Sequence, residues 1–211
     1  MNELAEIEQA ERVKSYCREY GVSAVLGIIF AILISWIWHY WRQAQENYLL
    51  TASMQYERLL AATVKNKNVN MQNSLAEGLI KNYPHTPYAS LAALLLAKQA
   101  VNQNNLTDAS HKLFWVIKHG EDQKLCSIAR IRLIRVLLAK NQARQALNIL
   151  AENNDPAYNP VFLEEKGDIL INLGRSKEAL QSYLAAKQAF SKSHIEQALL
   201  EMKINNLDNW C

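Results

Sequence analysis

A pattern of twenty residues occurs three times in this chain, and it limits the fold more than any other feature. Each copy has an apolar helical run, a turn residue and a second helical run: LLLAKQAVNQNNLTDASHKL at 94–113, IRLIRVLLAKNQARQALNIL at 131–150 and EEKGDILINLGRSKEALQSY at 164–183. The turns fall at Asn104, Asn141 and Gly174, residue types that tolerate a positive φ and end a helix at low cost. Because each hairpin leaves an apolar face that only another hairpin can cover, the sequence predicts stacked helical hairpins.

The spacing of the three copies is typical of a known repeat. Their alignment superposes a small residue of the second helix and, four residues later, a large one: Ala109, Ala146 and Ala179, then Leu113, Leu150 and Tyr183. The period is close to the roughly 34 residues of a tetratricopeptide repeat. A small side chain lets two helices cross closely, and the larger one fills the adjoining groove. Lys166 and the lack of closing prolines depart from the consensus, so a generic helical bundle is the alternative.

Helical periodicity extends to both sides of the three copies. Tyr48, Leu49, Ala52, Tyr56, Leu59, Leu60 and Thr63 follow an i, i+3, i+4 rhythm that continues outward from an apolar segment, and a break follows at 66–70. A further helix runs through Leu75, Leu79 and Ile80 to the turn at 83–87. Residues 194–207 predict a last helix that caps the stack, with Ile195, Leu199, Met202 and Leu207 inward.

Residues 21–41, GVSAVLGIIFAILISWIWHYW, contain no Lys, Arg, Asp or Glu. A helix of this length spans roughly 30 Å, which matches the hydrocarbon core of a bilayer. Tyr and Trp residues gather at its ends, as in an interfacial aromatic belt. An acid-rich preceding tail and the absence of a cleavage site disfavour a signal peptide. We therefore predict a tail (1–20), a transmembrane helix (21–41) and a repeat domain (42–211).

Basic residues beside this segment predict its orientation. Arg12, Lys14 and Arg18 lie close to one end, whereas Arg42 stands alone at the other until Arg58. Flanking Lys and Arg residues stay on the cytoplasmic side, and acidic residues count for little. The N-terminus is expected in the cytosol and the repeat domain across the membrane.

Small residues form one stripe along the transmembrane helix: Ser23, Gly27, Ala31 and Ser35. Such a stripe lets another helix approach closely in lipid. The alternative is a stripe that faces lipid, and the sequence names no partner helix.

The sequence offers no catalytic site, metal site or cofactor site. It contains no GxSxG, HExxH, Walker A or GxGxxG motif. Adjacent Glu164 and Glu165 point apart on a helix and are interpreted as acids of a helix N-terminus. A net charge of +3 does not favour nucleic-acid binding. A disulfide between Cys126 and Cys211 is left open.

Several features together resemble one bacterial family. They are the acidic tail, one span ending in aromatics, the repeats, the run TPYASLAALLLAK at 86–98 and MKINNL at 202–207. In these the chain resembles the ancillary SecYEG translocon subunit (YfgM-like) family. The resemblance implies a protein of the bacterial inner membrane whose C-terminal domain is periplasmic. It also implies association with SecYEG and with a PpiD-type membrane-anchored chaperone. Emerging secretory polypeptides are further expected partners.

In tetratricopeptide folds the first helices of successive units line a concave groove. The alignment places these residues along it: Lys98, Asn102, Arg135, Leu138, Glu164, Asp168 and Asn172. Mixed charge with apolar side chains suits an extended peptide or a partner helix. A merely solvated surface, or binding on the opposite side of the stack, is the alternative.

The leading hypothesis is therefore a non-enzymatic, membrane-anchored subunit of the translocon that binds proteins through its repeats. One alternative is an adaptor for another cell-envelope assembly complex. A second is a membrane-bound regulator that acts through its cytosolic tail.

The predicted orientation has a direct test. Alkaline phosphatase fused after residue 60 should be active, because this enzyme folds only in an oxidising compartment. A fusion after residue 15 is the matched control and should be inactive. An inactive fusion at residue 60 would contradict the orientation.

Overall fold

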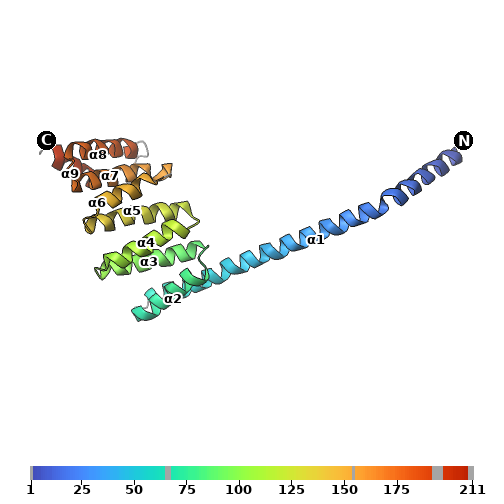
Figure 1. Cartoon of the computed structure of the whole chain (residues 1–211), viewed down its shortest axis with the longest axis horizontal. Coiled ribbons are helices and arrows are strands. Elements are labelled where there is room, and N and C mark those ends of the chain that lie inside the picture. Colours follow the sequence, from blue (N-terminus) through green and yellow to red (C-terminus); the bar gives the residue numbers. More distant parts are fainter. Residues whose placement is uncertain (1, 65–67, 154, 192–196, 209–211) are drawn as a thin grey trace. The chain divides into compact units, whose positions relative to one another are not determined.

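All regular structure in the described residues is helical (Figure 1), which confirms the all-α prediction. The computed structural model describes residues 2–64, 68–153, 155–191 and 197–208, with the backbone alone for 2–24, 28 and 208. Two units emerge, Met1–Leu50 and Thr51–Cys211, and the first helix contributes to both. The elements are α1 (Asn2–Val64), α2 (Val69–Asn82), α3 (Pro87–Asn102), α4 (Leu106–His119), α5 (Gln123–Ala139), α6 (Ala143–Ala151), the 3-10 turn η1 (Pro156–Tyr158), α7 (Asn159–Asn172), α8 (Ser176–Ser191) and α9 (Ala198–Asp208).

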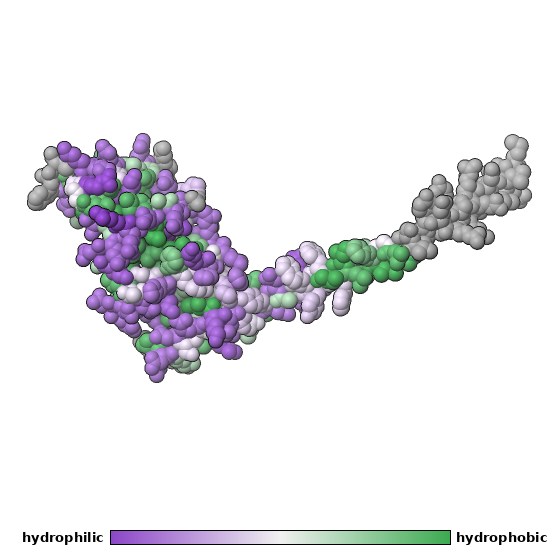
Figure 2. All heavy atoms as spheres, in the orientation of Figure 1, coloured by the Kyte–Doolittle hydropathy of each residue, from purple (hydrophilic) through white to green (hydrophobic). Residues whose placement is uncertain are grey.

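In the unit Met1–Leu50 the described backbone is helical from Asn2, and the described apolar side chains between 25 and 41 are exposed (Figure 2). From Val25 to Trp41 every large apolar residue with a described side chain is at least 47% exposed. Among the described residues, one helix is long and apolar enough to cross a bilayer. None of its most apolar stretch is buried. A core helix of a soluble domain would be covered instead. These properties agree with the predicted membrane anchor, and the boundaries at 20 and 41 stay predictions.

Three turns of the repeat unit have the conformation that the sequence predicts. Asn104, Asn141 and Gly174 have φ of 57°, 58° and 73°. The amide that follows each one donates to a carbonyl five residues back: Asn105 to Ala100 (2.8 Å), Gln142 to Leu137 (2.8 Å) and Arg175 to Leu170 (2.9 Å). These bonds define Schellman motifs, which satisfy the last carbonyls of the preceding helices. The same turn thus reverses the chain at each hairpin.

Small side chains lie at the helix crossings, as predicted. Ala109, Ala146 and Ala179 are fully buried in α4, α6 and α8. One apolar cluster extends from α3 to α7, a second joins α7, α8 and α9, and a third joins residues 51–64 of α1 to α2 and α3. Each helix from α2 onward contacts the next, so each hairpin covers the apolar face of its neighbour.

The structure corrects the predicted inward face of the last helix. Leu199 and Met202 are exposed, whereas Leu200 and Ile204 are buried in the second apolar cluster and Leu207 packs against it. These inward residues follow an i, i+4, i+7 stripe, which places 199 and 202 on the solvent side. Ile195 lies outside the described residues.

A similar correction applies to α1. Leu49 and Leu60 are exposed, while Ala52, Leu59 and Ala62 carry the buried face. The break predicted at 66–70 overlaps the gap between the end of α1 at Val64 and the start of α2 at Val69, although residues 69 and 70 are already helical.

A glycine permits the closest approach of α7 and α8. A Cβ atom on Gly167 would lie 2.1 Å from Cε1 and 2.4 Å from Cδ1 of the Tyr183 ring. Tyr183 is 3% exposed, so its ring has no free space in which to move. The ring of Tyr183 therefore fixes the distance between the two helices.

We expect Gly167→Ala to lower the free energy of unfolding by about 1–3 kcal/mol, because an overpacked crossing must open. Gly78→Ala is the matched control: its Cβ meets nothing within 4 Å, and alanine favours the interior of α2 by about 0.5–1 kcal/mol. Chemical denaturation of the full chain in mild detergent, followed by circular dichroism, measures both. A Gly167→Ala protein as stable as the wild type would contradict the close crossing.

Candidate protein-binding faces

The first helices of successive hairpins form one face of the repeat unit. Helix α3 contacts α5, and α5 contacts α7, in addition to their contacts within hairpins. We call this the first-helix face. It carries the residues that the sequence places in a groove, and the structure divides them into two groups.

The first group lines a hollow between α3 and α5, which we call the cationic hollow. Its volume is about 360 Å³, and its lining residues are Ala97, Lys98, Val101, Asn102, Leu113, Arg132, Arg135 and Val136. Three of the predicted groove residues, Lys98, Asn102 and Arg135, therefore come together there. Pockets of this size are within the range that binds ligands or side chains.

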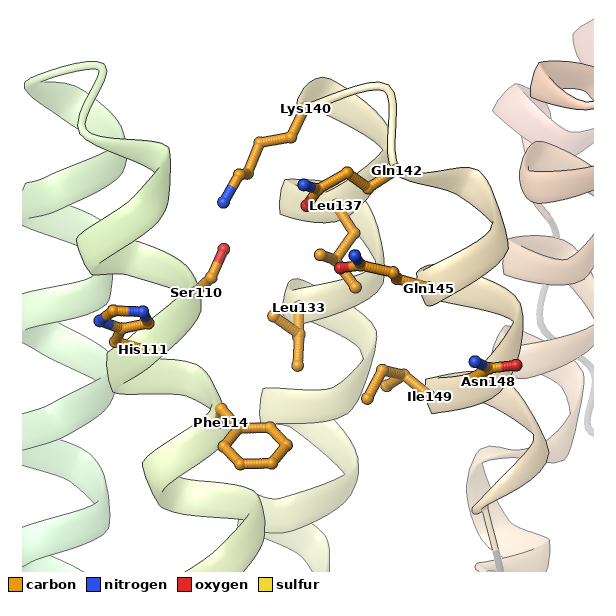
Figure 3. A pocket seen from close by; sticks show the side chains of 10 residues that line it. All are labelled: Ser110, His111, Phe114, Leu133, Leu137, Lys140, Gln142, Gln145, Asn148 and Ile149. Atoms are coloured by element: carbon orange, nitrogen blue, oxygen red, sulfur yellow. The ribbon is translucent and has the colours of Figure 1, made fainter.

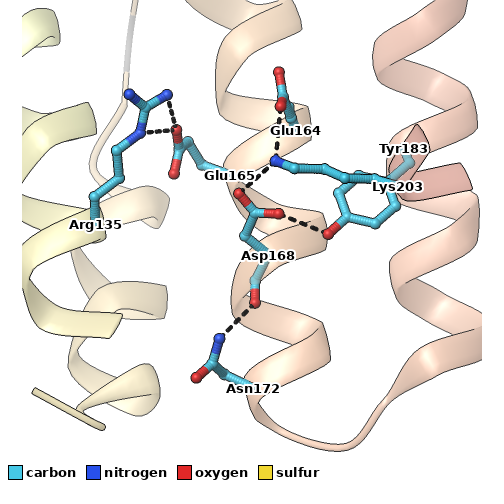
Figure 4. A network of polar contacts seen from close by, with 7 residues as sticks. All are labelled: Arg135, Glu164, Glu165, Asp168, Asn172, Tyr183 and Lys203. Atoms are coloured by element: carbon cyan, nitrogen blue, oxygen red, sulfur yellow. Dashed lines mark hydrogen bonds and ion pairs between the residues drawn. The ribbon is translucent and has the colours of Figure 1, made fainter. Parts of the chain in front are cut away.

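An ion pair between an exposed arginine and a buried glutamate fixes one wall of the cationic hollow (Figure 4). Arg135 donates from Nε (2.7 Å) and Nη2 (2.6 Å) to the same oxygen of Glu165, Oε1. The Glu165 side chain is 1% exposed and that of Arg135 is 61% exposed. Burial raises the pKa of Glu165, although the hydrogen bond and the charge of Arg135 oppose the rise. The second oxygen of Glu165 is buried and has no hydrogen-bond partner among the described residues.

The second group forms a network with the last helix. Lys203 of α9 donates to Glu164 Oε1 and to Asp168 Oδ2, both at 2.8 Å, and the Tyr183 hydroxyl donates to Asp168 Oδ1 at 2.6 Å (Figure 4). Burial opposes the charge of Lys203, but the hydrogen bonds to Asp168 and Glu164 outweigh it and raise its pKa. Burial and the bond to Asp168 raise the pKa of Tyr183. This network joins α7, α8 and α9.

The predicted groove is therefore not continuous along the stack. Glu164 and Asp168 are engaged by the chain's own last helix. Asn172 is exposed and donates to the backbone oxygen of Asp168 at 3.1 Å. Leu138 packs against the main apolar cluster and is outside the cationic hollow.

Sequence reasoning missed three residues of this face. Arg132 lies one helical turn before Arg135, and this i, i+3 spacing could have shown that they share a face. Glu165 is buried in the second turn of α7, so its interpretation as an acid of the helix N-terminus is wrong. Lys203 had no local signal, because its partners come from the packing of α9.

A second groove lies on the opposite helices (Figure 3). Helices α4 and α6 form its sides and α5 its floor, around about 390 Å³. Leu133, Leu137, Phe114 and Ile149 supply an apolar surface, and a polar rim comes from Ser110, His111, Lys140, Gln142, Gln145 and Asn148. Phe114 is 44% exposed. The sequence allowed for binding on this side but named none of these residues.

Residues 14–209 match the family described as "Tetratricopeptide repeat-like domain", which is most of the chain. The chain belongs to this family. The match agrees with the stacked hairpins, the Schellman turns and the buried alanines. No solved structure matches the chain at a significant level.

Curated relatives of this tetratricopeptide repeat-like protein share one name. The chain is 29% identical to the "Ancillary SecYEG translocon subunit" of Escherichia coli over 205 residues, 96% of both chains. It is 27% identical to the protein of that name from Haemophilus influenzae over 204 residues, 97% of this chain and 98% of the relative. A Buchnera aphidicola protein with the same name is 29% identical over 85% of this chain and 92% of its own. The resemblance expected from the sequence is confirmed.

Two other candidate features stay predictions. In the small-residue stripe Gly27, Ala31 and Ser35 are exposed, and the side chain of Ser23 lies outside the described residues. Cys126 is buried beside the carbonyl oxygens of Gly120 (3.3 Å) and Val116 (3.5 Å), and burial raises its pKa. Cys211, with which the sequence left a disulfide open, lies outside the described residues.

The buried carboxyl group predicts a pH dependence of stability. Because the pKa of Glu165 is raised in the folded chain, the folded state holds its proton more tightly than the unfolded state. As the pH rises from the ordinary glutamate value of about 4.3 through the folded pKa, the wild type should lose stability relative to Glu165→Gln. The loss is about 1.4 kcal/mol for each pH unit between the two pKa values.

Denaturation of the full chain across this pH range measures the difference. Glu178→Gln is the control, because it makes the same charge change at an exposed site. The hydrogen bond from Arg175 lowers the pKa of Glu178, so the sign of its effect is opposite. A difference between wild type and Glu165→Gln that does not change with pH would contradict the burial argument.

Proposed function

We propose that this protein is a non-catalytic, membrane-anchored subunit associated with the SecYEG translocon. The observation that supports this most is the similarity, over nearly the whole chain, to proteins named ancillary SecYEG translocon subunits. The tetratricopeptide repeat-like domain and the candidate membrane helix agree with a protein that holds a binding surface beside the membrane. Repeat stacks offer extended surfaces to other polypeptides.

The proposal includes an orientation. The N-terminal tail lies in the cytosol and the repeat domain in the periplasm, at the outer face of the bacterial inner membrane. The flanking basic residues support this, because Arg12, Lys14 and Arg18 precede the apolar segment. A binding domain in the periplasm would meet secretory polypeptides as they leave the channel.

The proposed partners are SecYEG, a PpiD-type membrane-anchored chaperone and emerging secretory chains. We assign their binding to the first-helix face around the cationic hollow. Lys98, Asn102 and Arg135 are exposed there beside the exposed Val101. Glu164 and Asp168 take a different role, since their ion pairs with Lys203 hold the last helix in place. The stripe at 23–35 is proposed to contact another helix within the membrane.

Site-specific photo-crosslinking in native membranes tests this function. A photoreactive residue at Asn102 lies on the first-helix face, and one at Gln145 lies in the opposite groove as the matched control. We expect crosslinks from position 102 to translocon subunits or to a PpiD-type chaperone, with far fewer from position 145.

Other outcomes identify the alternatives. Crosslinks only to other envelope assembly proteins would contradict the translocon and favour an adaptor of a different complex. Crosslinks that arise only from the tail, to a cytosolic regulator, would contradict both.

A further inference from the structure

The cationic hollow carries more positive charge than the surrounding residues balance. Lys98, Arg132 and Arg135 all line it. Glu165 balances Arg135 through the 2.6 Å ion pair. No ion pair or hydrogen bond between described side chains involves Lys98 or Arg132. Two cations therefore face the hollow without an acidic partner in the described part of the chain.

The guanidinium of Arg135 also has hydrogen-bond donors left for a second acceptor. Its Nε and Nη2 atoms donate to a single oxygen of Glu165. An Arg guanidinium has five N–H donors in a planar fork, so donors remain. Because Glu165 is buried and α7 is fixed by its packing, the remaining donors have a defined position. Asn102 adds an amide on the opposite wall.

The remaining lining of the hollow is apolar. Val101 is 42% exposed, and Ala97, Leu113 and Val136 are buried behind it. A free inorganic anion would leave Val101 in contact with water. A ligand that fits the whole hollow has a negative group next to an apolar one.

We infer that the cationic hollow binds an acidic segment of a partner polypeptide. Carboxylates of the segment contact Lys98 and Arg132, and an adjacent apolar side chain covers the exposed Val101. Charge-assisted hydrogen bonds to carboxylates are stronger than neutral ones, and complementary charge gives specificity and a fast association. This inference rests on the proposed function and adds the chemistry of the partner.

A membrane surface is a different class of anionic partner. Lipid headgroups would satisfy the cations, but they carry no apolar group at the depth of the headgroup that could cover Val101. The apolar lining therefore favours a polypeptide, and lipid is an outcome that the test can reveal.

Fluorescence anisotropy with the full chain in a non-ionic detergent tests the inference. The probe is a labelled peptide of Glu, Leu and Ser, and the same peptide with Gln in place of Glu is the uncharged comparison. We expect the double variant Lys98→Gln, Arg132→Gln to bind the acidic peptide about tenfold or more weakly than the wild type. The wild type should also prefer the acidic peptide to the Gln peptide by about tenfold, and this preference should shrink at high salt.

A matched variant separates the hollow from net charge. Arg144→Gln with Lys177→Gln removes the same two charges from exposed positions on α6 and α8, and it should bind the acidic peptide like the wild type. Equal binding by both double variants would overturn the inference. Displacement of the peptide by a short-chain anionic phospholipid at lower concentration than by unlabelled peptide would also overturn it.

The peptide experiment and the crosslinking experiment can contradict the inference and the proposed function separately. If position 102 crosslinks to translocon proteins while the affinity for the acidic peptide does not depend on Lys98 and Arg132, the proposed function stands and the inference of an acidic partner segment is wrong. If the hollow binds the acidic peptide but no translocon protein crosslinks, the chemistry stands and the proposed function is wrong.

Discussion

The repeat unit depends on one constraint, which is that no hairpin can bury its own apolar face. The three apolar clusters run from residues 51–64 of α1 to α9 without belonging to any single hairpin. Each Schellman turn reverses the chain so that the next helix can cover the previous one. Two ends of such a stack must be closed. Here the end of α1 packs at one end, and α9 packs at the other through Leu200 and Ile204.

The way in which the stack is closed divides the first-helix face. Lys203 of the closing helix takes the carboxylates of Glu164 and Asp168, so the acidic part of this face serves the fold. Glu165 serves the fold as well, since it holds Arg135 from a buried position. What remains open is the positive part between α3 and α5. Mixed charge in the sequence thus becomes a separation in space, with acids inside the network and cations facing outward.

The sequence predicted those features that a local pattern encodes. Turn residues at 104, 141 and 174, buried alanines at the crossings and the uncharged segment all depend on neighbours within one or two hairpins. It failed where packing between distant elements decides. The inward face of α9 was shifted because Leu199, Leu200, Met202 and Ile204 offer two apolar stripes, and only contact with α7 and α8 selects one. The role of Gly167 was missed for the same reason, since its partner is the ring of Tyr183 on α8.

Anchoring, stacking and an open positive hollow together support the proposal of a polypeptide-binding surface beside a membrane. The most direct measurement of this claim is a structure of the full chain co-purified with its native partners in mild detergent. The account predicts polypeptide density from a partner against Lys98, Arg132 and Arg135, with Lys203 still bound to Glu164 and Asp168. A partner seated only in the groove between α4 and α6, with the cationic hollow open to solvent, would contradict it.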